Sequence, residues 1–258
     1  MRISKQTVQV NGWSVHYEVV GKGEPVVLVH GLSESTRVWY KNLPALAERY
    51  RIYLVDLPGF GAMRKFHRQF NLEQSGAWLD GWMQTVGLEA ANLVGHSMGG
   101  YVCMALAAVH PEKVKHLVLV DSIGIPFGLP ADRLVYPALK AIVRTIPSFW
   151  WCIGYDYLRA GPAMIFKASR QIVALNTAEV LASVRVPTLI VWGEDDDLVP
   201  FSLGRQLHER LAGARLFVLP GTNHFCMYEQ PREFNNALLT FLQGQDVGIE
   251  AAVSSGQL

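Results

Sequence analysis

Charged residues are few in this sequence, and the two signs almost cancel. Only 17% of the 258 residues are charged, and 23 lysines and arginines against 22 aspartates and glutamates give a formal net charge of +1. Binding to nucleic acid depends on a strongly basic surface, so this balance argues against a nucleic-acid partner. Half of the residues are apolar, which is enough for a large core and excludes general disorder.

Cysteine is also rare. Cys103, Cys152 and Cys226 are widely scattered, so neither a disulfide framework nor the spacing of a metal site is visible. No apolar run approaches the length that spans a bilayer, and the N-terminal stretch lacks the apolar centre of a signal peptide. A cytoplasmic protein without a membrane span is the expectation.

Two kinds of strand pattern follow one another along the chain. Residues 7–10 and 13–20 alternate between polar and apolar around Asn11-Gly12, which predicts an antiparallel hairpin with a type I′ turn. Later runs are apolar at nearly every position, as parallel strands covered on both faces require. These runs are residues 26–30, 51–58, 91–97, 116–122, 188–195 and 214–221.

Helix-like stretches separate these runs, at residues 38–50, 72–87, 99–111 and 201–213. Alternation of strands and helices predicts an α/β fold with a doubly wound, mostly parallel sheet, and the early hairpin adds an antiparallel edge. One segment, from about residue 123 to 185, has no buried-strand pattern and contains five prolines and many aromatic rings. We interpret it as a mostly helical insertion over the sheet. The tail after residue 243 has weak periodicity and is expected to be flexible.

The aromatic residues of this insertion permit two interpretations. The stretch PSFWWCIGYDYL, residues 147–158, could line a pocket for an apolar group or could form a satellite core that serves stability only. Contact with a membrane surface is less favoured than burial, because the stretch lacks a clear basic amphipathic stripe.

Three glycines surround Ser97 in the stretch LVGHSMGGYV. The context is a strand, a tight turn and a helix, and such a turn lifts the serine hydroxyl above the edge of the sheet. Gly95 and Gly99 are explained sterically, because the incoming strand and the outgoing helix nearly touch there. The backbone N–H of Met98 begins the helix and would face developing negative charge. A purely structural glycine turn is the alternative.

A nucleophilic serine needs a base and a carboxylate that orients the base. His224 follows the last buried strand in GTNH, at the strand end where the sites of such sheets gather. The acids at residues 194–197 follow the preceding apolar strand, although a solvated loop would also explain them. Leu32, after His30-Gly31, is the natural second donor to an oxyanion. His30 is a weaker candidate for the base, because it precedes the serine in the chain.

Taken in this order, the motifs resemble those of the α/β-hydrolase family over roughly residues 8–243. They are VVLVHG (26–31), VDLPGFG (55–61), VGHSMGG (94–100), LIVWGEDD (189–196) and GTNH (221–224). The resemblance implies an eight-stranded, mostly parallel sheet flanked by helices, with a helical cap inserted after the sixth strand. It divides the chain into a core (1–122 and 187–243), a cap (123–186) and a tail (244–258).

The resemblance also implies residue roles. Ser97 is the nucleophile and His224 the base, and the backbone N–H groups of Leu32 and Met98 form the oxyanion hole. Asp196 orients the base, because the family acid lies three residues after a glycine and four before a proline, here Gly193 and Pro200.

Three other polar residues near these motifs receive separate interpretations. Asp121 is the rival acid, since some relatives place theirs after the sixth strand. Asp56 is interpreted as a residue that organises its loop. His96 adjoins Ser97, but neighbouring strand residues point to opposite sides, so a structural role away from the serine is expected.

The implied activity is hydrolysis of a carboxylic ester of small to medium, largely apolar substrates through a serine acyl-enzyme, with no metal or cofactor. Serine at position 97 argues against the haloalkane dehalogenase and epoxide hydrolase branches, which need a carboxylate nucleophile. Three alternatives stay open. They are a carbon–carbon bond hydrolase of the meta-cleavage type, a cofactor-free perhydrolase or haloperoxidase, and a ligand receptor without catalysis.

The predicted cap carries more basic than acidic residues. Its bases are Arg133, Lys140, Arg144, Arg159, Lys167, Arg170 and Arg185, and its acids are Asp132, Asp156 and Glu179. The motif order is similar to that of the pimeloyl-carrier-protein methyl esterase group, which implies an acidic acyl-carrier protein as a partner at this surface. Basic residues that are only solvated are the simpler interpretation.

Overall fold

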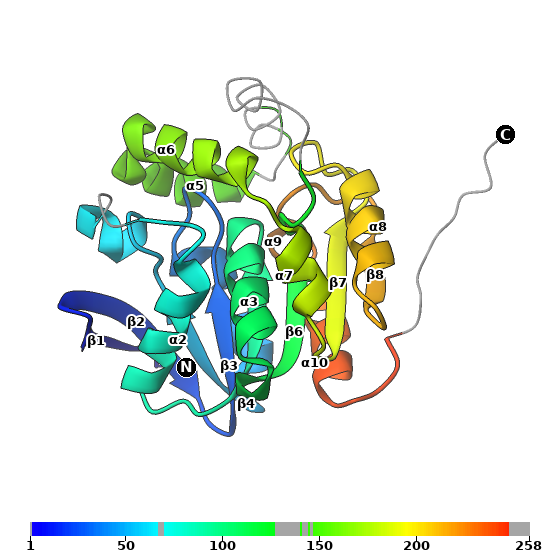
Figure 1. The fold of residues 1–258 in the computed structure, drawn as a ribbon, viewed down its shortest axis with the longest axis horizontal. Helices are drawn as coiled ribbons and strands as arrows, with labels where there is room; N and C mark the ends of the chain where they lie inside the picture. The colour runs from blue at the N-terminus through cyan, green and yellow to red at the C-terminus, as the bar shows by residue number, and fades with distance from the viewer. Residues whose placement is uncertain (1, 67–69, 127–139, 141–143, 145–146, 248–258) are drawn as a thin grey trace, which may run out of the picture.

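The computed structural model describes residues 2–66, 70–126, 140, 144 and 147–247, and its centre is one eight-stranded sheet (Figure 1). The strands are β1 (Ser4–Val10), β2 (Trp13–Gly21), β3 (Glu24–Val29), β4 (Tyr50–Val55), β5 (Ala91–His96), β6 (Val114–Val120), β7 (Thr188–Gly193) and β8 (Arg215–Leu219). Their spatial order is β1-β2-β4-β3-β5-β6-β7-β8. The pairs β1–β2 and β2–β4 are antiparallel and all later pairs are parallel, which confirms the predicted sheet.

The hairpin at the start of the sheet has the predicted turn. Val10 pairs with Trp13, and the two residues between them have positive φ, 49° at Asn11 and 81° at Gly12. A type I′ turn needs positive φ at both central positions, and asparagine and glycine adopt it most readily.

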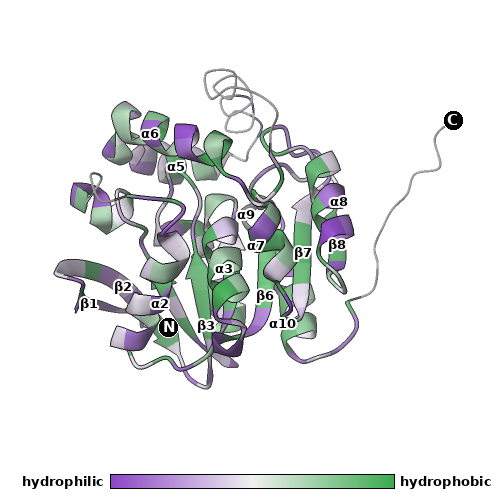
Figure 2. Ribbon diagram, viewed as in Figure 1, coloured by the Kyte–Doolittle hydropathy of each residue, from purple (hydrophilic) through white to green (hydrophobic). Residues whose placement is uncertain are grey.

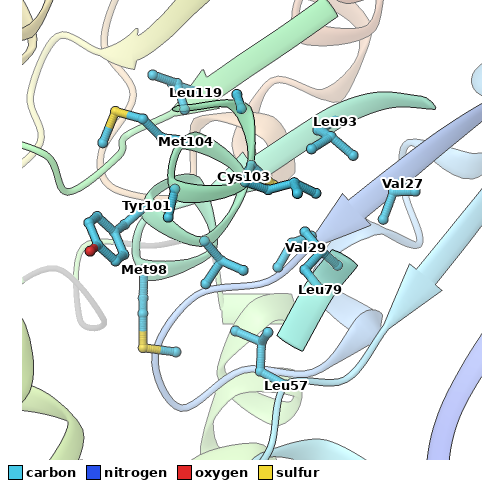
Figure 3. Close-up of a cluster of buried hydrophobic side chains, with 14 of the residues drawn as sticks. Val27, Val29, Leu57, Leu79, Leu93, Met98, Tyr101, Cys103, Met104 and Leu119 are labelled. Carbon is cyan, nitrogen blue, oxygen red and sulfur yellow. The ribbon is translucent and has the colours of Figure 1, made fainter. Parts of the chain in front are cut away.

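Helices cover both faces of the sheet, and consecutive residues of one strand belong to different cores. Val27 and Val29 of β3 lie in one hydrophobic cluster, while Val26 and Leu28 lie in the other. Figure 2 shows β3 as an almost continuously hydrophobic strand, and Figure 3 shows Val27 and Val29 in their cluster. Burial on both faces is the reason that these strands lack a polar alternation.

The helices divide between the two clusters. One cluster contains side chains of α2 (Ser75–Thr85), α3 (Met98–Val109), α7 (Ala178–Ser183) and α8 (Phe201–Arg210). The other contains side chains of α1 (Leu43–Leu46), α9 (Cys226–Glu229) and α10 (Pro231–Leu242). Three short 3-10 helices, η1 (Thr36–Trp39), η2 (Gly61–Phe66) and η3 (Pro111–Lys113), lie in the connections.

Helix α10 does not correspond to any predicted element. It begins at Pro231, and its buried side chains include Phe234, Leu238 and Phe241, which recur at helical spacing. A proline at the first helical position followed by this period is a start signal that the sequence interpretation missed.

Helices α5 (Pro147–Ala160) and α6 (Pro162–Ala174) follow β6 and lie beyond the end of the sheet to which β3 and β7 point (Figure 1). The positions of these helices agree with the expected helical insertion. Its bounds at 123–186 stay a prediction, because Phe127, Asp132, Arg133 and Tyr136 lie outside the described residues. The same holds for most of the tail, whose description ends at residue 247.

The aromatic residues of α5 are divided between two environments. Phe149 is buried, and its ring centroid lies 4.5 Å from that of Phe225 and 4.2 Å from that of Tyr228. In contrast, Trp151 is 87% exposed and Leu158 is 81% exposed, so the expectation that this stretch is buried is wrong for them. In the part of the chain that the structure describes, no helix has the length and apolarity to cross a bilayer.

Two helical glycines provide a test of the packing. A Cβ on Gly204 in α8 would lie 2.6 Å from the ring of the fully buried Trp192, whereas a Cβ on Gly154 in α5 meets nothing within 4 Å. We expect Gly204→Ala to lower the free energy of unfolding by about 1–3 kcal/mol through overpacking. The matched variant Gly154→Ala should raise it by about 0.5–1 kcal/mol, because alanine favours a helix more than glycine. Chemical denaturation of both variants measures the difference, and equal stability would contradict this account of the packing.

Candidate active site

Ser97 lies in a strained turn between β5 and α3. Its φ is 51° and its ψ is −117°, a conformation that few residues with a side chain adopt. A Cβ on Gly95 would overlap the Gly99 carbonyl oxygen, and one on Gly99 would lie 2.5 Å from the carbonyl oxygens of Val29 and His30. The predicted contact between the incoming strand and the helix is confirmed for Gly95, whereas Gly99 is crowded by the end of β3.

Backbone hydrogen bonds hold the turn in place. The N–H of Ser97 donates to the Val120 carbonyl over 2.8 Å, and its carbonyl accepts from the N–H groups of Gly100 (3.0 Å) and Ile123 (3.2 Å). The first residue of α3 is Met98, so its N–H lies at the positive end of a twelve-residue helix. That position agrees with the donor role predicted for Met98, which stays a prediction.

His224 and Asp196 form a buried hydrogen-bonded pair. Nδ1 of His224 donates to Oδ2 of Asp196 over 2.8 Å, and the other oxygen of Asp196 accepts from the N–H groups of Leu198 and Val199, both at 2.8 Å. These bonds fix the carboxylate, which in turn fixes the tautomer of the imidazole. The other ring nitrogen, Nε2, is then the one that can accept a proton.

The pKa of His224 reflects two opposing effects. Burial lowers it, but the charge of Asp196 and the hydrogen bond to Asp196 outweigh burial and raise the pKa to about 9. Asp121 and Glu34 add smaller contributions in the same direction. The site therefore favours the imidazolium form of this histidine, the form that a base assumes after it takes a proton.

The turn at Ser97 meets the His224 loop through His96. Nε2 of His96 lies 2.7 Å from the carbonyl oxygen of His224, and the centroids of the two rings are 4.8 Å apart. The structure therefore brings the residue next to the predicted nucleophile against the predicted base, although positions 97 and 224 are distant in the chain.

The side chain of Asp121, the rival acid, lies near His224 but bonds elsewhere. Its Oδ1 accepts from the N–H of Gly193 over 2.7 Å, whereas the imidazole is bonded to Asp196. Burial, and then repulsion by Asp196, raise the pKa of Asp121 well above its usual range. Asp196 is bonded directly to the imidazole and Asp121 is not, so the geometry favours Asp196 as the orienting acid.

The loop after β3 lies against the serine. A Cβ on Gly31 would lie 3.0 Å from the Cβ of Ser97, which places the neighbouring Leu32 in the same loop at the site. His30 belongs to the framework of this loop, because its Nδ1 donates to the Gly31 carbonyl (2.8 Å) and its Nε2 accepts from the N–H of Leu57 (3.0 Å). The donor role of Leu32 stays a prediction.

The role expected for Asp56 is confirmed. Its two carboxylate oxygens accept from the N–H groups of Thr36 (2.9 Å) and Ala62 (2.8 Å), so the residue ties together two connections on either side of β4.

The sequence interpretation missed Glu34. The side chain of His96 contacts Glu34 and the backbone of His224, which agrees with the structural role expected for it. Glu34 is buried beside Gly31, four residues after His30, and an acid so close to the predicted oxyanion loop was the available signal.

Two basic residues of the predicted cap contact the loop that carries Asp196. Lys140 Nζ lies 2.8 Å from Asp197 Oδ1, and Arg144 Nη1 lies 2.6 Å from Asp197 Oδ2. Their charges are partly neutralised by this contact, which weakens the electrostatic argument for an acidic carrier protein.

One cluster of three potential metal ligands lies among the described residues. It consists of His96, Asp121 and His224, whose potential ligand atoms lie within 4.8 Å of one another. Both ring nitrogens of His96 already form hydrogen bonds, to Glu34 and to His224. A metal ion would have to replace one of these contacts, so the cluster fits a hydrogen-bonded site better than a metal site.

Comparisons with known proteins agree with this architecture. A family model for the alpha/beta hydrolase fold matches residues 24–151. A protein assigned as carbamate hydrolase RutD of Caulobacter is 30% identical over 254 residues, which cover 90% of this chain and 95% of the relative. The chain belongs to the alpha/beta hydrolase fold family.

Further similar proteins are named as hydrolases of 2-hydroxy-6-oxo-dienoic acids or of meta-cleavage products. The 2-hydroxy-6-oxo-6-(2'-aminophenyl)hexa-2,4-dienoic acid hydrolase of Metapseudomonas resinovorans is 28% identical over 275 residues, covering 91% of this chain and 89% of the relative. The crystallised meta-cleavage product hydrolase from Pseudomonas fluorescens has a TM-score of 0.79 and 25% identity, covering 93% of this chain and 97% of that one.

The raised pKa of His224 determines the expected pH dependence. A base must be unprotonated before it accepts a proton, so kcat/KM should rise with pH up to about 9 and level off above it. Initial rates on a nitrophenyl ester, corrected for spontaneous hydrolysis at each pH, measure the profile. Rates that are already at their plateau at neutral pH would contradict the assignment.

Substitution of each acid separates the two candidates. Asp196→Asn removes the charge that orients His224, and we expect kcat to fall by a factor on the order of 10³–10⁴. Asp121→Asn keeps an acceptor for the Gly193 N–H and leaves the bond between His224 and Asp196 in place, so kcat should change by less than about tenfold. Steady-state kinetics measure kcat of both variants. A greater loss of kcat in Asp121→Asn than in Asp196→Asn would contradict the assignment of Asp196 as the orienting acid.

Proposed function

We propose that this protein is a serine hydrolase that cleaves carboxylic esters of small to medium, largely apolar substrates through an acyl-enzyme. The observation that supports this function best is the buried bond of 2.8 Å between His224 and Asp196. The residue before Ser97, which itself has a φ of 51°, contacts the backbone of His224. A serine held in a strained turn, together with an oriented imidazole, is what acyl transfer requires.

In the proposed mechanism, His224 Nε2 takes the proton of Ser97 while Oγ attacks the carbonyl carbon of the ester. The negative oxygen of the tetrahedral intermediate accepts hydrogen bonds from the N–H groups of Leu32 and Met98. His224 then returns the proton to the leaving alcohol oxygen. Water repeats the sequence, which releases the acid and restores Ser97.

Carbon–carbon bond hydrolysis of the meta-cleavage type is the second candidate, because relatives that cover about nine tenths of the chain are named as 2-hydroxy-6-oxo-dienoic acid hydrolases. The same serine, histidine and aspartate would serve, but the leaving group must be protonated at carbon rather than at oxygen. An ester needs only the proton that His224 already holds, so the proposed site residues account for ester cleavage without a further group.

The substrate class is tested with a panel of nitrophenyl esters of graded acyl length and a 2-hydroxy-6-oxo-dienoic acid. We expect ester turnover to exceed turnover of the dienoic acid, and Ser97→Ala to lower the faster reaction by at least about 10⁴. Faster cleavage of the dienoic acid would replace the ester assignment by the carbon–carbon one. Halogenation that depends on peroxide would instead indicate a haloperoxidase.

A fluorophosphonate probe distinguishes an enzyme from a ligand receptor. The probe should label the wild-type chain at Ser97 and fail to label Ser97→Ala. Ser202→Ala, which removes an exposed serine from α8, is the matched control and should be labelled like the wild type. A wild-type protein that the probe does not label would contradict the proposal that Ser97 is a nucleophile.

A further inference from the structure

Three buried histidines lie around the candidate site, and their hydrogen-bond partners differ. His30 contacts one acceptor and one donor, so a neutral ring with the proton on Nδ1 satisfies both contacts. His224 donates from Nδ1 to Asp196 and keeps Nε2 for proton transfer. His96 is different, because both of its nitrogens face acceptors.

The contacts of His96 determine where its protons lie. Nε2 lies 2.7 Å from the carbonyl oxygen of His224, and a carbonyl group accepts but never donates, so Nε2 carries a proton. Nδ1 lies 3.0 Å and 3.1 Å from the two carboxylate oxygens of Glu34. With Glu34 ionised, Nδ1 also carries a proton and the ring is an imidazolium.

The surroundings of Glu34 support the ionised form. Its Oε2 also accepts the N–H of Gly31 over 2.8 Å, and its side chain is only 4% exposed. A buried carboxylate is strongly unfavourable unless a positive group and hydrogen-bond donors surround it, and His96 and Gly31 supply both. Burial alone would raise the pKa of Glu34, but the charge and hydrogen bond of His96, with smaller contributions from His30 and the Gly31 N–H, outweigh burial and hold it below its usual value.

We propose that Glu34 and His96 form a buried carboxylate–imidazolium pair that positions the catalytic groups of the proposed hydrolase. This inference rests on the proposed function for its kinetic consequences, but not for the protonation state itself. Neither residue touches the reacting atoms, so both are positioning residues.

The pair joins the three segments that carry the proposed chemistry. Glu34 holds the N–H of Gly31, next to the predicted donor Leu32, and His96 is the residue before Ser97. The other nitrogen of His96 holds the backbone of His224. Charge-assisted hydrogen bonds are shorter and stronger than neutral ones, so an ion pair fixes these segments more firmly than a neutral contact would.

The charged groups around His96 come from several elements. Glu34 faces it from the loop after β3 and His224 from the loop after β8, and an oxygen of Asp121, after β6, lies within 4.8 Å of nitrogens of both rings. Since the pair of Glu34 and His96 has no net charge, it can sit beside the pair of His224 and Asp196 without opposing protonation of the base.

Nitrogen NMR of the histidine rings tests the protonation state directly. In protein labelled with ¹⁵N histidine, the resonances absent from His96→Gln identify His96. Both nitrogens of His96 should give the shifts of protonated nitrogens, whereas a neutral ring would give one protonated and one unprotonated nitrogen. A resonance of an unprotonated nitrogen from His96 in the wild-type protein would overturn the proposal, whether or not the protein hydrolyses esters.

Kinetics test the positioning role. We expect Glu34→Gln to lower kcat by roughly tenfold to a hundredfold with KM changed less than about twofold, because the reacting groups are displaced while the substrate pocket remains. The matched variant Glu48→Gln makes the same chemical change at an exposed position and should behave like the wild type. A wild-type kcat in Glu34→Gln would refute the role.

A double substitution separates an ion pair from simple packing. Each single change, Glu34→Gln or His96→Gln, leaves one buried charge without its partner, whereas the double variant leaves none. The loss of kcat in the double variant should therefore be no greater than in the worse single variant, and multiplicative losses would contradict an ion pair. If Glu34→Gln does not fold, the NMR measurement still decides the question, because it needs only the wild-type chain and His96→Gln.

Discussion

The close crossing of β5 and α3 beneath Ser97 is the constraint on which the candidate site depends. A Cβ on Gly95 would overlap the backbone of Gly99 in α3, and one on Gly99 would overlap the backbone at the end of β3, so neither residue has space for a side chain. Ser97, between these two glycines, has a positive φ, a conformation that costs on the order of 1–3 kcal/mol. Hydrogen bonds from the neighbouring strand and from α3 hold the residue in this conformation, so the rigid sheet maintains the strain at the proposed nucleophile.

Around this turn the site gathers three buried carboxyl groups, and their partners give each a different state. Asp196 is bonded to His224 and raises its pKa, while Asp121 has a raised pKa because it is buried near that same charge. Glu34 is paired with His96. The three carboxyl groups are chemically alike, but each has a different hydrogen-bond partner. In a buried site, where water does not screen charge, such partners determine the pKa of each group.

Prediction from sequence succeeded where the signal was local. The apolar runs, the Asn11-Gly12 turn and the glycines around Ser97 each express a steric or solvation rule that acts within a few residues. Prediction was weaker where packing between elements distant in the chain determines whether a residue is buried. Trp151 is an aromatic residue expected to be buried, yet it lies on the outer side of α5, and the amphipathic helix α10 was not identified. Asp196 was chosen among four adjacent acids by family resemblance rather than by the pattern of the residues.

The amino-acid sequence by itself determined the order of strands and helices, the strained turn and the residue types available at the carboxyl ends of the strands. The tertiary structure alone decided that Asp196 rather than Asp121 is bonded to His224, and that Glu34 meets His96. The reason is physical. Backbone sterics and hydrophobic periodicity act between neighbours in the chain, whereas hydrogen bonds between residues 34, 96 and 224 depend on the order of the strands and the paths of three separate loops.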